Sequence, residues 1–175
     1  SEAGFTEGPA PAGRLTALRR EMSRLKLDAF IIPRTDEYQG EYVPARAERL
    51  RWLTGFGGSA GVAAVMQENA AIFVDGRYTI QVRQQVDVEA FTPRHVSDEP
   101  LGDWLKETLA EGGVVGVDPW LHTRDSLARI ERAVDAAGGR VERLSANLID
   151  AIWDAQPAAP LSPVLAHGMD YTGEA

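Results

Sequence analysis

The residues best equipped for chemistry are 75–78 (Asp-Gly-Arg-Tyr), which place a carboxylate, a guanidinium and a phenol directly after an apolar run. Short loops that follow strands often carry functional side chains. Two interpretations remain open. In the first, Asp75 caps a helix, Arg77 pairs with a carboxylate and Tyr78 packs on the core. In the second, Arg77 projects toward a peptide or another domain. We take Arg77 and Tyr78 as candidates for contact with substrate or with a neighbouring domain.

A second candidate group lies in residues 34–45, where polar and turn-forming residues replace any periodic pattern. Such a composition predicts an irregular loop. Asp36, Glu37 and Tyr38 lie in this loop, and we expect them to face substrate or a neighbouring domain as well.

Residues 57–61 (Gly-Gly-Ser-Ala-Gly) match the G-x-S-x-G pattern of serine hydrolases. That motif requires a strand before the serine and a helix after it. Here a helix is predicted before Ser59 and a strand after it, so the order is inverted and we reject a serine hydrolase with Ser59 as its nucleophile. The same inversion argues against a dinucleotide loop at Gly55 and Gly57. We expect a tight connection in which Ser59 bonds to a turn amide.

Composition narrows the function further. His95, His122 and His167 are far apart and match no metal-binding spacing, and the chain has no cysteine, so we predict neither a metal site nor a catalytic residue. The net charge of −8 disfavours nucleic-acid binding. No apolar stretch has the length of a membrane span. Together these features predict a cytoplasmic protein.

Hydrophobic periodicity predicts alternating helices and strands. Helices are expected at 14–26, 45–53, 75–85, 101–108, 123–137 and 145–153, and strands at 28–32, 61–66, 70–74, 86–91, 114–117 and 140–144. Residues 67–69 have the length of a hairpin connection, and both flanking strands are apolar enough to be central in the sheet. The order predicts a three-layer α/β/α fold with a mixed sheet.

The chain divides into three parts. Residues 1–13 are expected to be a disordered leader and residues 14–154 a single domain. Residues 155–175, with prolines at 157, 160 and 163, are expected to form a linker into a second domain. Trp153, just before this linker, is the residue we expect to pack against whatever follows.

Taken together, residues 41–44, 51–61, 75–78 and 115–119 resemble the N-terminal domain of Xaa-Pro aminopeptidase (aminopeptidase P), a domain type shared with prolidase and creatinase. Residues 147–153 and 168–173 are similar to the three-domain form. The resemblance implies a ribonuclease-H-like fold and a parent homo-oligomeric enzyme that releases the residue preceding proline from Xaa-Pro peptides.

The same resemblance implies two divalent metal ions, usually manganese, held by a downstream "pita-bread" domain. None of those ligands can be carried over to this sequence. The domain encoded here would restrict access to the active site and support contacts between domains and subunits.

A stand-alone peptide- or protein-binding module is the alternative. The fold also resembles the N-terminal domain of the large FACT histone-chaperone subunit, which binds proteins without cutting them. An acidic body would attract basic partners. The match to the peptidase and the linker favour the first interpretation.

Overall fold

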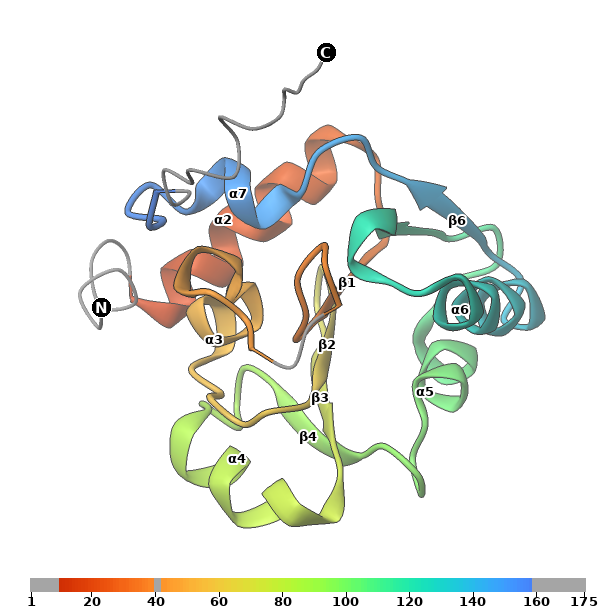
Figure 1. The fold of residues 1–175 in the computed structure, drawn as a ribbon. Coiled ribbons are helices and arrows are strands. Elements are labelled where there is room, and N and C mark those ends of the chain that lie inside the picture. Colours follow the sequence, from red (N-terminus) through yellow and green to blue (C-terminus); the bar gives the residue numbers. More distant parts are fainter. Residues whose placement is uncertain (1–9, 40–41, 159–175) are drawn as a thin grey trace.

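The structure, a computed structural model, describes residues 10–39 and 42–158. A six-stranded mixed sheet separates two groups of helices (Figure 1). The α-helices are α2 (Pro11–Arg24), α3 (Arg49–Thr54), α4 (Thr79–Gln85), α5 (Leu101–Thr108), α6 (Arg124–Ala136) and α7 (Leu148–Ile152). The strands are β1 (Ala29–Pro33), β2 (Val62–Met66), β3 (Ala70–Val74), β4 (Thr92–His95), β5 (Val114–Val117) and β6 (Arg140–Arg143). Short 3₁₀ turns are η1 (Ala45–Ala47), η2 (Gly76–Tyr78) and η3 (Pro119–Leu121).

The strand order is β4-β3-β2-β1-β5-β6. The hairpin β2–β3 is antiparallel, as is the pair β1–β2, whereas β3–β4, β1–β5 and β5–β6 are parallel. Both hairpin strands are almost wholly buried, which confirms that the hairpin is central. The mixed sheet confirms the predicted fold class.

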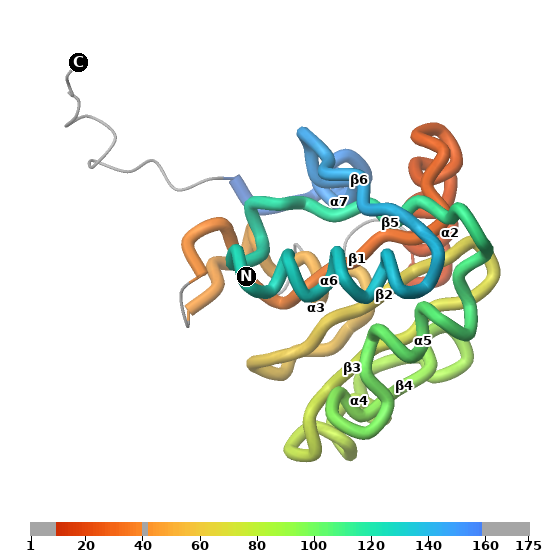
Figure 2. Tube along the Cα trace, turned by 90° about the vertical axis from the view of Figure 1, so that its right-hand side faces the viewer, coloured from red at the N-terminus to blue at the C-terminus, as the bar shows by residue number. Residues whose placement is uncertain are grey.

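Each face of the sheet has its own core. Alternate residues of β1 supply both, because successive side chains of a strand point to opposite faces: Phe30 belongs to one core and Ile31 to the other. Helices α2, α3, α4 and α7 cover the first face, and α5 and α6 cover the second (Figures 1 and 2).

The core changes the role expected for Trp153. Its indole is only 2% exposed and stacks on Trp52 with ring centroids 5.4 Å apart. The expectation that Trp153 packs against a following domain is therefore wrong, because α7 turns this side chain inward onto α3.

Several element boundaries differ from the prediction. Helix α2 begins at Pro11, within the expected leader, because proline fits the first turn of a helix. The expected helix 45–53 is split into η1 and α3 at Glu48, whose ψ of 58° is not helical. Residues 1–9 and 159–175, which make up most of the expected leader and linker, lie outside the described residues.

The strand expected at 86–91 is also wrong. Val86 and Phe91 are buried, but Asp87 folds the chain between them into a turn. Its carboxylate accepts a hydrogen bond from the Glu89 amide at 2.9 Å, and its carbonyl accepts one from the Phe91 amide at 2.9 Å. The strand starts only at Thr92, since local side-chain hydrogen bonds compete with a sheet ladder.

Candidate functional site

The motif at residues 75–78 forms the predicted cap. The Asp75 carboxylate accepts a hydrogen bond from the Arg77 amide at 2.9 Å and pairs with Nη2 of Arg77 at 3.1 Å. Hydrogen bonds from Arg77 lower the pKa of Asp75, and the same pair raises the pKa of Arg77. The Arg77 side chain is nevertheless 69% exposed, so its guanidinium keeps donors free to reach a ligand at the surface.

Tyr78 joins this motif to the glycine-rich loop. Its phenol is hydrogen-bonded to Ser59 Oγ, its ring meets Phe56 edge-to-face, and the guanidinium of Arg77 lies 5.0 Å from its ring centroid. The hydrogen bond to Ser59, followed by the positive charge of Arg77, lowers the pKa of Tyr78. A guanidinium beside a polarised phenol suits binding of a carbonyl or carboxylate oxygen.

Ser59 differs from the prediction. It was expected to bond to a turn amide, but its hydroxyl contacts the Tyr78 phenol instead. The loop itself is held by Gly57, whose amide donates to Gln85 Oε1 at 2.9 Å. Nothing in the sequence pairs Ser59 with Tyr78, because the contact depends on how the loop packs beside η2.

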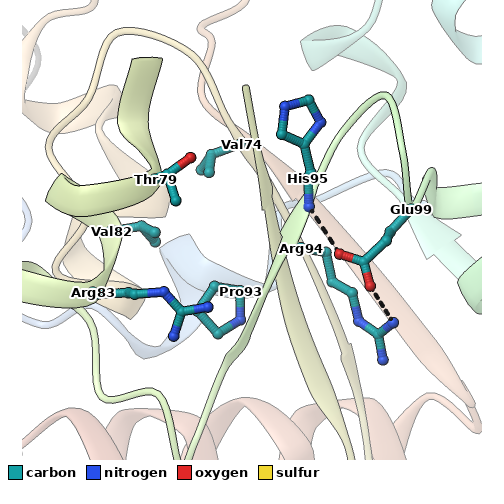
Figure 3. Close-up of a pocket in the computed structure, with 8 residues that line it drawn as sticks. All are labelled: Val74, Thr79, Val82, Arg83, Pro93, Arg94, His95 and Glu99. Carbon is teal, nitrogen blue, oxygen red and sulfur yellow. Dashed lines mark hydrogen bonds and ion pairs between the residues drawn. The ribbon is translucent and has the colours of Figure 1, made fainter. Parts of the chain in front are cut away.

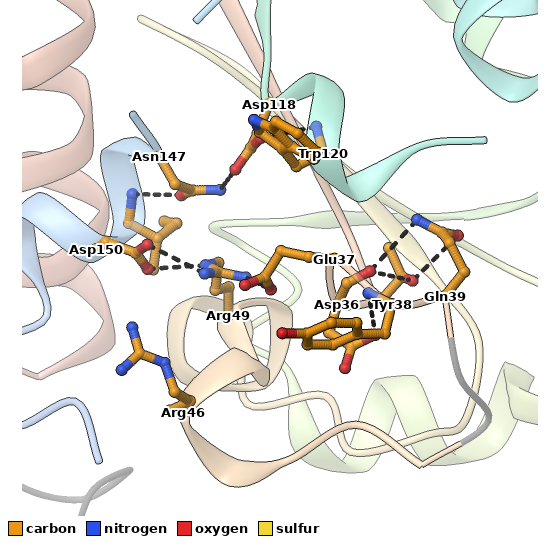
Figure 4. Close-up of polar contacts among 12 residues, drawn as sticks. Asp36, Glu37, Tyr38, Gln39, Arg46, Arg49, Asp118, Trp120, Asn147 and Asp150 are labelled. Atoms are coloured by element: carbon orange, nitrogen blue, oxygen red, sulfur yellow. Dashed lines mark hydrogen bonds and ion pairs between the residues drawn. The ribbon is translucent and has the colours of Figure 1, made fainter. Parts of the chain in front are cut away.

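The second candidate group lies elsewhere, in the polar contacts of Figure 4. Asp36 is buried, and its carboxylate accepts from the Tyr38 amide at 3.1 Å, so it orders the loop. Glu37 points toward Arg49, with 3.8 Å between Oε1 and Nη1. Tyr38 is exposed. Glu37 therefore lies with Arg49, and Asp36 and Tyr38 lie in the loop that carries Glu37, whereas Arg77 and Tyr78 lie with Ser59.

Sequence reasoning missed Arg49. Its guanidinium binds Asp150 through two hydrogen bonds of 2.8 and 3.0 Å across 101 residues. Burial lowers the pKa of Arg49, but the hydrogen bond and charge of Asp150 outweigh it and raise the pKa. Nearby, Asn147 caps α7 and donates to the buried Asp118 carboxylate at 2.9 Å.

These residues surround a surface hollow of about 440 Å³. We call this surface the Arg49 face and define it by Glu37, Arg49, Trp120, Ser145, Asn147 and Asp150.

A smaller hollow of about 190 Å³ lies where β3 and β4 end beside α4 (Figure 3). The carboxylate of Glu99 accepts hydrogen bonds from Arg94 Nη1 at 3.0 Å and from the His95 amide at 3.3 Å. Glu99 thus neutralises the charge of Arg94. It also accepts the hydrogen bond of the His95 main-chain amide, in the edge strand β4.

No group of three or more His, Cys, Asp or Glu side chains that could hold a metal ion occurs among residues 10–39 and 42–158. The part of the chain that the structure describes does not fit a two-metal centre. Within the same residues, no helix has the length and apolar character needed to cross a membrane.

Comparison with known proteins gives consistent matches. The model of the creatinase/prolidase N-terminal domain family matches residues 14–151. Xaa-Pro aminopeptidase 2 from Homo sapiens is 36% identical over 160 residues, 91% of this chain and 24% of that protein. Aminopeptidase P1 from Arabidopsis thaliana is 33% identical over 148 residues, 84% of this chain and 23% of that protein. The chain spans about a quarter of the length of these curated relatives.

Solved structures agree with the fold. One is X-prolyl aminopeptidase from Caenorhabditis elegans, a cytosolic enzyme with a di-nuclear active site. The superposition covers 86% of this chain and 26% of that enzyme's chain, with a TM-score of 0.80 and 28% sequence identity. Another is the N-terminal domain of the cytoplasmic peptidase PepQ from Mycobacterium tuberculosis H37Rv. Here the superposition covers 80% of this chain and 98% of that domain's chain, with a TM-score of 0.60 and 23% sequence identity.

Proposed function

This chain belongs to the creatinase/prolidase N-terminal domain family, and on that premise we propose that it is the non-catalytic N-terminal domain of a metal-dependent Xaa-Pro aminopeptidase. The observation that carries the proposal is the 36% identity to Xaa-Pro aminopeptidase 2 over 91% of this chain but only 24% of that protein. The parent enzyme would release the N-terminal residue that precedes proline, in the cytoplasm, as the cytosolic relative from Caenorhabditis elegans suggests.

The catalytic metals belong to the rest of the polypeptide in this proposal. The di-nuclear site of the same relative supports two divalent ions, for which we propose manganese. No catalytic step is assigned to this domain in the proposal, because the chain matches only 24% of its relative Xaa-Pro aminopeptidase 2.

The role of this domain is to restrict access to the active site and to support assembly of domains and of a homo-oligomer. Exclusion by shape can select short peptide ends without adding contact energy. Arg77 and Tyr78 support a peptide-facing role, because an exposed guanidinium and a polarised phenol can bind a substrate carbonyl or carboxylate. Asp36, by contrast, is occupied in ordering its own loop.

The test uses the full-length protein and two peptides that differ only in having proline or alanine at the second position. We expect release of the first residue from the proline peptide only. A chelator should abolish the release and Mn²⁺ should restore it. Residues 1–175 alone should show no turnover. Equal cleavage of both peptides, or cleavage that survives chelation, would contradict the proposal.

A further inference from the structure

The Arg49 face exposes aromatic surface. Trp120 lines this face and is 70% exposed, and Tyr38, which follows Glu37 in the chain without lining the face, is exposed as well. Burying an aromatic side chain stabilises a contact by roughly 25 cal/mol for each Å² removed from water, and tryptophan is enriched where interfaces gain most of their energy. These two rings are therefore suited to contact with another protein surface.

The same face holds a buried donor that has no hydrogen-bond acceptor among the described residues. Arg49 is 4% exposed, and its Nη1 makes no hydrogen bond to any described residue. The nearest carboxylate oxygen is Glu37 Oε1, 3.8 Å away on a half-exposed side chain. Covering the face would remove water from Glu37, strengthen its attraction to Arg49 and draw it into hydrogen-bonding distance.

The last described residues also lie beside this face. Gln156 donates hydrogen bonds to Asp150 and to the Arg46 carbonyl, each at 2.8 Å. Residue 158 is the last one described, and the curated relatives are about four times as long as the part that matches. A domain joined to Gln156 through the linker expected at residues 155–175 would be present at this face at an effective concentration of about millimolar.

We infer that the Arg49 face is the docking surface for the domain that follows in the same polypeptide, a step that rests on the proposed function. That domain packs an apolar side chain against Trp120. It also presents donors to the acidic rim, where Glu37 and Asp150 outnumber Arg49. Electrostatic complementarity then sets the orientation of the two domains.

The test is thiol accessibility in the native full-length protein. Residues 1–175 contain no cysteine, so Ser145→Cys and Ser97→Cys each introduce one thiol into this region by the same conservative change. Both serines are exposed, but only Ser145 lines the Arg49 face. We measure N-ethylmaleimide labelling of each site by peptide mass spectrometry. Ser145→Cys should react at least about tenfold more slowly than Ser97→Cys, with equal rates in urea.

A second variant links the protection to the aromatic contact. Trp120→Ala should raise the labelling rate of Ser145→Cys, whereas Ile80→Ala, at a side chain 74% exposed on α4, should not. Equal labelling of the two thiols in the native protein overturns the inference. Protection that appears only at high protein concentration also overturns it, since it would indicate a second copy of the chain.

Peptide cleavage by the same samples separates the two proposals. Fast labelling of Ser145→Cys with intact Xaa-Pro cleavage rejects the docking surface alone. Slow labelling without cleavage rejects the peptidase assignment and leaves the docking surface standing.

Discussion

At the residue scale, the polar side chains divide into those that order the fold and those left available at the surface. Asp36 and Asp118 are buried and hydrogen-bonded, so their role is local order. Arg77 is different because it is paired and still largely exposed. Exposed ion pairs contribute little to stability, so the pair with Asp75 should add little to folding, and the contact role proposed for Arg77 is to be tested by kinetics.

Arg77→Ala should therefore affect catalysis rather than folding. In the full-length protein we expect kcat/KM for an Xaa-Pro peptide to fall about tenfold, as for loss of one charge-assisted hydrogen bond. The urea midpoint should stay unchanged. Arg140→Ala is the matched control, since Arg140 is 65% exposed and pairs with a carboxylate two residues away at 2.9 Å. Unchanged kinetics in Arg77→Ala would reduce Arg77 to a structural role.

His122 makes stability depend on pH. Burial lowers the pKa of His122, and the charge of Asp118 opposes this only in part. The unfolded chain therefore takes up a proton more readily than the folded one as the pH falls through about 6.5. The stability contribution is complete above that pH and is lost below it. We expect urea unfolding of His122→Gln to vary less between pH 7.5 and about 5.5; an equal slope in both proteins would contradict this.

At the element scale, turns and caps decide where each helix and strand begins. Thr123 caps α6 as predicted, accepting a hydrogen bond from the Ser126 amide at 3.0 Å. The edge strand β4 is closed to further pairing by Pro93, which has no amide hydrogen, and by the Glu99 carboxylate on the His95 amide. Such edges limit aggregation.

The turn after α3 requires a glycine. Gly55 has φ +89°, and a Cβ built there lies 2.6 Å from the Gln85 carbonyl oxygen. Gly112 has a similar φ of +78°, but no atom of the described part of the chain lies within 4 Å of such a Cβ. Gly112→Ala should cost about 1 kcal/mol for the left-handed conformation. Gly55→Ala should cost about 3 kcal/mol, because overlap with the carbonyl is added. Urea unfolding measures both, and equal losses would show that the turn relaxes freely.

At the scale of the whole molecule, two distant segments are joined across the first core. The pair Arg49–Asp150 and the stacked rings of Trp52 and Trp153 connect α3 to α7. Breaking a buried ion pair by removing one partner leaves an uncompensated charge, which is far more costly than breaking an exposed pair.

Asp150→Asn should lower the free energy of unfolding by about 3 kcal/mol. This value is the lower end of the range for breaking a buried ion pair, and we choose it because the Asp150 side chain is partly exposed. Glu142→Gln, the same change in the exposed pair with Arg140, should alter it by less than about 0.5 kcal/mol. Chemical denaturation of both variants measures the difference. Equal losses would mean that water already screens the Arg49 pair.

The sequence by itself determined the order and type of the elements, the central hairpin and the cap at Asp75. Periodicity, glycine turns and capping residues act within a few positions of each other, so their effects can be read locally. The family resemblance rested on motifs of the same short range.

Only the tertiary structure decided the rest. The contacts Ser59–Tyr78 and Arg49–Asp150, and the inward turn of Trp153, depend on which strands become neighbours. The strand at 86–91 failed for a related reason: Val86 and Phe91 are apolar because they fill the core from a turn. Burial produces the same apolar pattern in a strand and in a packed loop, and packing alone distinguishes them.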